Sequence, residues 1–125
     1  MKYLFDSNMI IMTVMALNPM LQRRVADCDE GDIVTSAIAY AEVAHGAARG
    51  KPPSFEKLQA FIEEAPVLDF DLKAAQVYAT LSFKRASYDR LIAAHTLSHG
   101  LTLVTDNEAD FDDIPDLKVE NWTKP

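Results

Sequence analysis

Four acidic side chains and one amide stand where a metal site could form: Asp6, Glu42, Asp89, Asp106 and Asn107. Hard divalent cations such as Mg²⁺ prefer carboxylate oxygens as ligands. Ionised carboxylates do not gather without a cation, because like charges raise one another's pKa. A bound cation would also lower the pKa of a water molecule and attract a phosphodiester. If folding brings these side chains together, the sequence therefore predicts metal-dependent phosphodiester chemistry.

Each of these side chains also has a purely structural explanation. Asp6 can cap a helix, Asp89 can be favoured by the dipole of a first helical turn, and the Asp-Asn pair can serve a turn. Glu42 is more informative, because it is the only formally charged residue between Ile33 and Ala48. A helix this apolar is expected to be largely buried, and a buried carboxylate must be paired, protonated or metal-bound. The structural explanation for Glu42 is a salt bridge or a position at the edge of the helix that reaches solvent.

The elements that must position these residues alternate along the chain. Short apolar runs predict strands over 2–5, 33–35, 67–70, 101–105 and 117–122. Capping residues and apolar spacing predict helices over 9–16, 19–27, 37–49, 55–64, 72–85 and 87–99, with a turn or short helix over 106–111. This alternation indicates an α/β fold with a mainly parallel sheet of four to five strands flanked by helices. Because sites in such sheets lie at the carboxyl ends of strands, we expect Asp6 and Asp106 to meet.

The bulk composition sets the outer limits. The chain has 125 residues, which predicts a single domain over 1–125, and one cysteine, which excludes an internal disulfide. Asp6 interrupts the apolar stretch that a signal peptide needs, and the run 9–17 is too short to cross a bilayer, so we expect a soluble, cytoplasmic protein. A net charge of −7 disfavours nucleic-acid binding by charge alone, unless a cation neutralises the acids where phosphate approaches.

Several motifs, taken in order, resemble the VapC toxins of the PIN-domain family. They are the stretches 2–8 (KYLFDSN), 35–47 (TSAIAYAEVAHGA), 88–95 (YDRLIAAH), 103–107 (LVTDN) with the aromatic at 111, and 119–122 (VENW). The single motifs are weak, but the set covers nearly the whole chain. The resemblance implies a PIN-like fold and a toxic, Mg²⁺- or Mn²⁺-dependent endoribonuclease of a type II toxin–antitoxin system.

The resemblance also implies roles for individual residues. The metal ligands of the family match Asp6, Glu42 and Asp89. Its fourth polar position matches Asn107, which completes the predicted catalytic set. Asp106, one residue earlier, is a supporting residue that could substitute for it if the turn is displaced.

Supporting roles go to Ser7 and Thr105, which flank the predicted ligands in the motifs. The cations nearest the third acid, Lys84, Arg85 and Arg90, are candidates for contacts with the RNA backbone. The implied partners are a VapB-like antitoxin, structured RNA such as tRNA, and a second copy of the chain in a homodimer.

An alternative reading keeps the fold but not the reaction. The fourth position carries Asn107 where the family has an acid, and only 81–88 separates the preceding helix from Asp89, a shorter stretch than is common in the family. These features favour a PIN-like domain that binds RNA or a partner without cleaving it. Magnesium-dependent cleavage that is lost in Asp6→Asn would exclude this alternative.

Overall fold

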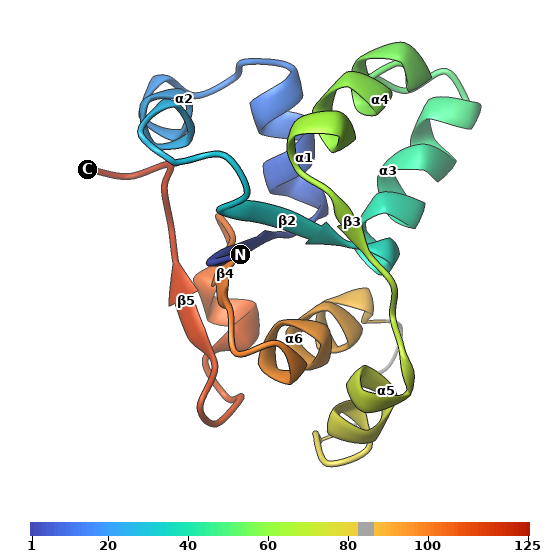
Figure 1. Ribbon diagram of the computed structural model, residues 1–125, viewed down its shortest axis with the longest axis vertical. Coiled ribbons are helices and arrows are strands. Elements are labelled where there is room, and N and C mark those ends of the chain that lie inside the picture. Colours follow the sequence, from blue (N-terminus) through green and yellow to red (C-terminus); the bar gives the residue numbers. More distant parts are fainter. Residues whose placement is uncertain (83–86) are drawn as a thin grey trace.

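A computed structural model of the chain describes residues 1–82 and 87–125 (Figure 1). The strands are β1 (Tyr3–Phe5), β2 (Ile33–Ser36), β3 (Val67–Leu68), β4 (Thr102–Val104) and β5 (Lys118–Glu120). The α-helices are α1 (Ser7–Val14), α2 (Pro19–Ala26), α3 (Ala37–Ala48), α4 (Phe55–Glu64), α5 (Leu72–Tyr78) and α6 (Tyr88–Ser98). A short 3₁₀ helix, η1 (Glu108–Phe111), follows β4. The predicted alternation of strands and helices is confirmed.

The five strands form one sheet in the order β3-β2-β1-β4-β5, and every pair is parallel. The chain moves outward from β1 to β2 and β3, then crosses to the other side of β1 to build β4 and β5. The central strand β1 therefore lies where the direction of winding reverses, between β2 and β4. In sheets of this kind ligands bind outside the carboxyl ends of the strands at that point.

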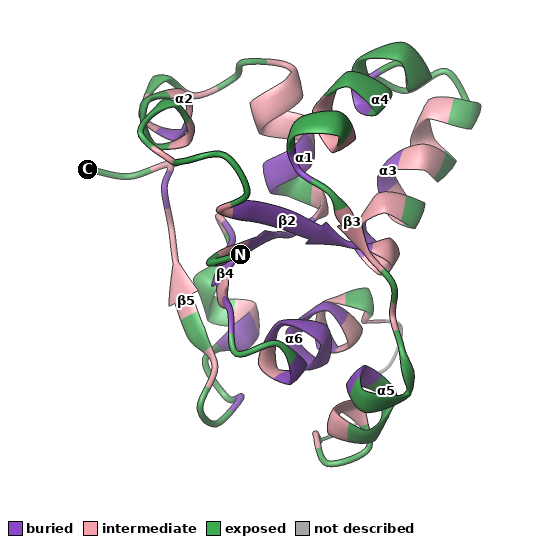
Figure 2. Cartoon of the chain, viewed as in Figure 1, coloured by how far each residue is buried: buried purple, intermediate pink, exposed green. Residues whose placement is uncertain are grey.

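Helices cover both faces of the sheet. Helices α1, α3 and α4 lie on one side, and α5 and α6 lie on the other (Figure 1). The central strands and α6 carry the most deeply buried positions (Figure 2). Leu4, Phe5, Leu103 and Ile92 are fully buried there, which explains why these strands read as short continuous apolar runs. This core fixes the central strand ends that carry the acidic residues.

Helix caps explain several element boundaries. Asp6, Asn18, Ser54 and Asp71 each accept a hydrogen bond from a backbone N–H three residues later, at the start of α1, α2, α4 and α5. These polar residues satisfy donors that the first turn of a helix leaves unpaired. The local sequence therefore sets where the helices begin.

Several predicted elements are shorter than expected, among them the strand predicted over 117–122, which spans only Lys118–Glu120. The strand predicted over 67–70 pairs with β2 only through Val67 and Leu68, because the chain then turns so that Asp71 can cap α5. The helix predicted over 72–85 ends at Tyr78. None of the helices in the described ranges is both long and apolar enough to cross a membrane.

Candidate acidic active site

The strand register brings the acidic residues to one edge of the sheet. Phe5, the last residue of β1, lies beside Thr35 of β2 and Val104 of β4. The Thr35 hydroxyl donates a hydrogen bond to the Phe5 carbonyl at 2.7 Å, and the Asp6 N–H donates to the Val104 carbonyl at 3.3 Å. The residues that follow these strands therefore emerge side by side.

A cleft of about 220 Å³ opens at this edge. It is lined by Asp6, Ser7, Asn8, Glu42, Asp89, Asp106, Asn107 and Phe111. The four predicted catalytic residues and the supporting Asp106 are all in this set, although they are spread over 102 positions of sequence, from residue 6 to residue 107. They come from the ends of β1 and β4, from α3, and from the first turn of α6.

Asp6 is the most buried of these acids, with 6% of its surface exposed. One carboxylate oxygen accepts a hydrogen bond from the Met9 N–H at 2.9 Å, and the Thr105 hydroxyl also hydrogen-bonds to the carboxylate. The pKa of Asp6 is raised from 3.8 to about 6, chiefly by burial. The nearby carboxylates of Asp106 and Asp89 contribute to this rise, and the hydrogen bonds oppose it. A cation in the cleft would relieve this cost of ionisation.

Glu42 faces the cleft from the middle of α3. Its Oε1 accepts a hydrogen bond from the Ser7 hydroxyl at 2.6 Å, which joins α3 to the first turn of α1. The expectation of a largely buried α3 is wrong in part, because only Ala39 and Val43 of the helix are fully buried. Glu42 is half-buried. Only one side of α3 packs against the core, so solvent reaches the Glu42 carboxylate.

The start of α3 is fixed by a second contact. Ser36 caps this helix, and its hydroxyl lies 2.7 Å from Nδ1 of His95 on α6. Burial lowers the pKa of His95, which favours the neutral ring in this contact. The pair ties the helix that carries Glu42 to the helix that carries Asp89.

The turn after β4 separates the roles of Asp106 and Asn107. The Asn8 amide donates to both carboxylate oxygens of Asp106, at 3.3 and 3.2 Å. The amide of Asn107 donates instead to Asp110 at 2.6 Å. The carboxylate of Asp106 also acts electrostatically on Asp6 and contributes to raising its pKa.

Of the three cations predicted to contact RNA, the structure describes only Arg90. Lys84 and Arg85 lie outside the described residues. Arg90 is only 4% exposed, and its guanidinium forms an ion pair with Asp113 at 2.5 Å. An arginine held in this way is not free to meet a phosphate, so the prediction for Arg90 is replaced by a structural role in fixing α6.

Two lining residues were not among the predicted site residues. Asn8 is two positions after Asp6, and its place in the first turn of α1 was the available signal. Phe111 of η1 belongs to the fourth motif of the resemblance, but nothing in that motif indicated that its ring would line the cleft.

The donor set suits a hard divalent cation. Carboxylate oxygens from four chain segments and two amide side chains line one cleft, which matches the ligands of Mg²⁺. Within the described residues, however, no three His, Cys, Asp or Glu side chains are close enough to hold a metal ion as they stand. Hydrogen bonds from Ser7 and Asn8 hold Glu42 and Asp106 in this arrangement.

Comparison with known proteins defines the class to which this fold and cleft belong. The PIN domain family matches residues 3–117. A tRNA(fMet)-specific endonuclease VapC of Salmonella typhimurium is 30% identical over 131 residues, which cover 98% of each chain. Ribonuclease VapC2 of Rickettsia felis is 33% identical over 101 residues, covering 74% of this chain and 75% of the relative.

Solved structures agree with the sequence comparison. The crystal structure of VapBC2 from Rickettsia felis bound to a DNA fragment from its promoter matches with a TM-score of 0.83 and 25% identity, over 98% of this chain and 99% of the other. The chain therefore belongs to the PIN-domain family. Within that family it is a VapC-like ribonuclease, which confirms the resemblance in the motifs and the predicted enzyme class.

Proposed function

We propose that this chain is a toxin that hydrolyses phosphodiester bonds of structured RNA with a divalent cation held by Asp6, Glu42 and Asp89. The observation that carries the proposal is that these side chains and Asp106 line one cleft. This cleft lies at the carboxyl end of β1, where the direction of winding of the sheet reverses. PIN-domain nucleases generally depend on divalent metals, and the oxygen-only donor set favours Mg²⁺, with Mn²⁺ as the alternative.

The chain's own residues have separate tasks in this reaction. A bound divalent cation supplies a water molecule of lowered pKa and a positive charge for the phosphate. Asp6 is held rigidly by the Met9 N–H and the Thr105 hydroxyl, so its carboxylate is fixed before any ligand arrives. Glu42, oriented by Ser7 and open to solvent, can accept the proton of the attacking water.

Asp106 takes the fourth position in this proposal, and Asn107 supports the turn. Asn8 holds the carboxylate of Asp106 toward the cleft, whereas Asp110 engages the amide of Asn107. The substitution of an amide for an acid at residue 107 therefore does not by itself remove an acidic group from the site.

The substrate and the partner are proposed from the relatives. Two of them are named tRNA(fMet)-specific endonucleases, which favours tRNA as the RNA. Similar structures are of VapBC complexes, which favours a VapB-like antitoxin as the regulating partner. A basic side chain from such a partner would be attracted to the acidic cleft. Homodimerisation stays a prediction from the family resemblance.

The decisive experiment is cleavage of purified total tRNA by the isolated protein. It compares Mg²⁺, Mn²⁺ and EDTA for the wild type, Asp6→Asn, Glu42→Gln and Asp89→Asn. We expect discrete fragments only with metal, and a loss of at least a hundredfold in each variant. Glu63→Gln, an exposed acid on α4 outside the cleft, is the matched control and should keep wild-type activity.

Two outcomes would contradict the proposal. Cleavage that persists in EDTA or in the three variants would place the activity elsewhere or in a contaminant. Binding of tRNA without cleavage under either metal would instead support the alternative of a PIN-like domain that does not cleave RNA.

A further inference from the structure

An apolar cavity adjoins the acidic cleft. It has a volume of about 400 Å³ and is lined by Ile38, Ala41, Glu42, His45 and Tyr88. This volume lies in the range of about 300–1,000 Å³ that is typical of small-molecule sites. Glu42 lines both this cavity and the acidic cleft, so a group held in the cavity would lie directly beside the cleft.

One wall of the cavity is a single face of α3. Ile38, Ala41, Glu42 and His45 follow the spacing i, i+3, i+4 and i+7, which places them in one row along the helix. Such a row normally packs into a core, but here Ala41 and His45 are exposed and Ile38 is only half-buried. The residues of α3 that pack into the core are instead Ala39 and Val43.

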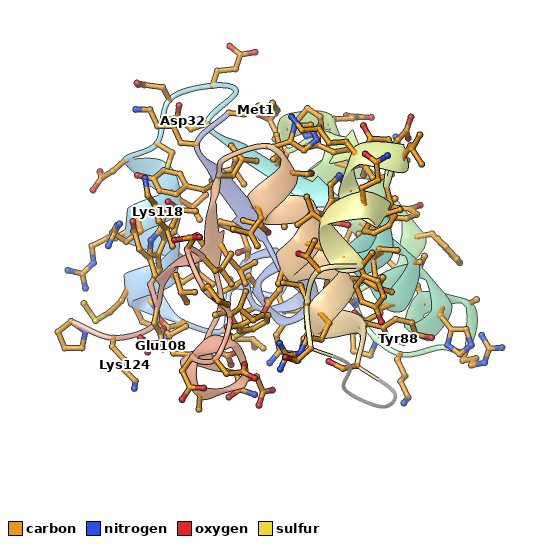
Figure 3. All side chains as sticks on the ribbon, turned by 90° about the horizontal axis from the view of Figure 1, so that it is seen from below. Met1, Asp32, Tyr88, Glu108, Lys118 and Lys124 are labelled. Carbon is orange, nitrogen blue, oxygen red and sulfur yellow. The ribbon has the colours of Figure 1, made fainter. Side chains whose placement is uncertain are left out.

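The opposite wall is Tyr88, at the first turn of α6. Its side chain is 58% exposed, and Figure 3 shows it at the edge of the molecule on the same side as α3. The next residue, Asp89, lines the acidic cleft. Successive helical residues point about 100° apart, so one helical turn presents a carboxylate to the cleft and an aromatic ring to the cavity.

The chemistry of the lining indicates what the cavity holds. Among the residues that the structure describes, Glu42 is the only carboxylate in the lining and no lysine or arginine contributes to it, so these residues do not favour a phosphate. A tyrosine ring, an imidazole and a flat surface of small aliphatic groups suit a planar, uncharged ring with polar edges. Unpaired bases in single-stranded RNA stack on such aromatic side chains.

We propose that this cavity is a base-binding subsite, in which an unpaired nucleobase next to the scissile phosphate stacks on Tyr88. The inference rests on the proposed function, and it adds that cleavage requires a single-stranded nucleotide at this position. Each phosphate in RNA joins two nucleosides, so a phosphate in the acidic cleft necessarily brings a base to its edge. Tyr88 is a positioning residue that holds this base, and His45 offers a polar edge on the other wall.

The test combines a change in the protein with a change in the RNA. The substrate is a short RNA that contains a single site mapped in the wild-type tRNA digest, and its variants carry an abasic sugar on either side of the scissile bond. Each RNA is cleaved by the wild type, Tyr88→Leu and Tyr88→Phe, and kcat and KM are measured separately. Ala41→Leu, which narrows the cavity from α3 without changing Tyr88, is the second variant.

For the intact RNA we expect Tyr88→Leu and Ala41→Leu to raise KM about tenfold, as stacking of one base is typically worth this much. Glu63→Gln, the exposed control on α4, should keep wild-type kinetics, and Tyr88→Phe, which retains the ring, should raise KM less than Tyr88→Leu does. With the abasic sugar at one of the two positions, KM of the wild type should rise by a similar factor. On that RNA Tyr88→Leu should raise KM no further. If the protein variant and the abasic RNA remove the same contact, their effects on KM are not additive. This non-additivity is specific to a contact between the Tyr88 ring and that base.

Three results would overturn the proposal. Equal losses for Tyr88→Leu on intact and abasic RNA would mean that Tyr88 acts through the structure of α6. Unchanged RNA cleavage, with weaker binding of a VapB-like antitoxin, would assign the cavity to a protein side chain. Failure of the wild type to cleave any RNA would refute the proposed function itself and the subsite with it. Only the wild type is needed for this result, so it is distinct from a failure of the subsite, which appears in the variants.

Discussion

Replacing Asp6 by Asn should make the metal-free protein more stable while it abolishes cleavage. Asp6 is only 6% exposed, and burial raises its pKa from 3.8 to about 6. Because the folded-state pKa lies above the unfolded one, ionisation of this side chain opposes folding. Its contribution to stability is fully present below pH 3.8 and is lost as the pH rises through about 6. Asn keeps the oxygen that accepts the Met9 N–H but carries no charge.

The size of the effect follows from the two pKa values. The difference between 3.8 and about 6 is about 2, and each pKa unit corresponds to about 1.4 kcal/mol. At pH 8 the ionised side chain therefore costs the folded state about 3 kcal/mol. At pH 5 the folded protein still binds a proton that the unfolded chain has mostly released, and the cost is about half as large.

The assay is urea unfolding of wild type and Asp6→Asn in EDTA at pH 5 and pH 8. His95, whose pKa burial lowers, makes both proteins lose stability as the pH falls, so this contribution cancels in the difference between them. We expect the variant to be more stable by about 3 kcal/mol at pH 8 and by about 1.5 kcal/mol at pH 5.

Adding Mg²⁺ at pH 8 should close this gap, because a ligand that binds only the folded wild type stabilises it by mass action. Glu63→Gln, the exposed control on α4, should show no pH-dependent difference from the wild type. A variant that is less stable than the wild type at pH 8 in EDTA, or a gap that does not widen between pH 5 and pH 8, would refute the reasoning.

Further predictions follow from the contacts around the cleft. Ser7→Ala removes the 2.6 Å hydrogen bond to Glu42 and should lower kcat about tenfold, with a change in unfolding free energy below about 1 kcal/mol; an unchanged kcat would mean that Glu42 needs no orientation. Asp106→Asn should weaken Mg²⁺ binding, measured by calorimetry, at least tenfold more than Asn107→Ala, and the reverse order would assign the fourth position to Asn107. Arg90→Met breaks a pair whose carboxylate partner remains solvated, so urea unfolding should show a loss of about 1–2 kcal/mol. The salt dependence of tRNA binding should not change in this variant, and a smaller slope would restore Arg90 as a phosphate contact.

The sequence by itself determined most of the local structure. Asp6, Ser54 and Asp71 are short polar side chains that cap the helices after them, and the apolar runs that become β1, β2 and β4 are too short for helices. These signals act over a few residues, so they survive without any knowledge of the fold. The alternation that they define limits the topology to a mainly parallel sheet, which already places Asp6 and Asp106 at one edge.

Only the tertiary structure decided how the candidate site is built. The local sequence cannot show that Arg90 turns inward to Asp113, because this contact joins residues 23 positions apart. It equally cannot show that Asn8 holds Asp106 across 98 positions while Asn107 turns to Asp110. Charge and spacing identify which side chains can do chemistry, but the direction in which each one points depends on packing between distant segments. The row Ile38, Ala41, Glu42 and His45 on α3 is a further example. Its spacing predicts a face that packs into the core, and only the tertiary structure shows that this face lines a cavity beside the cleft.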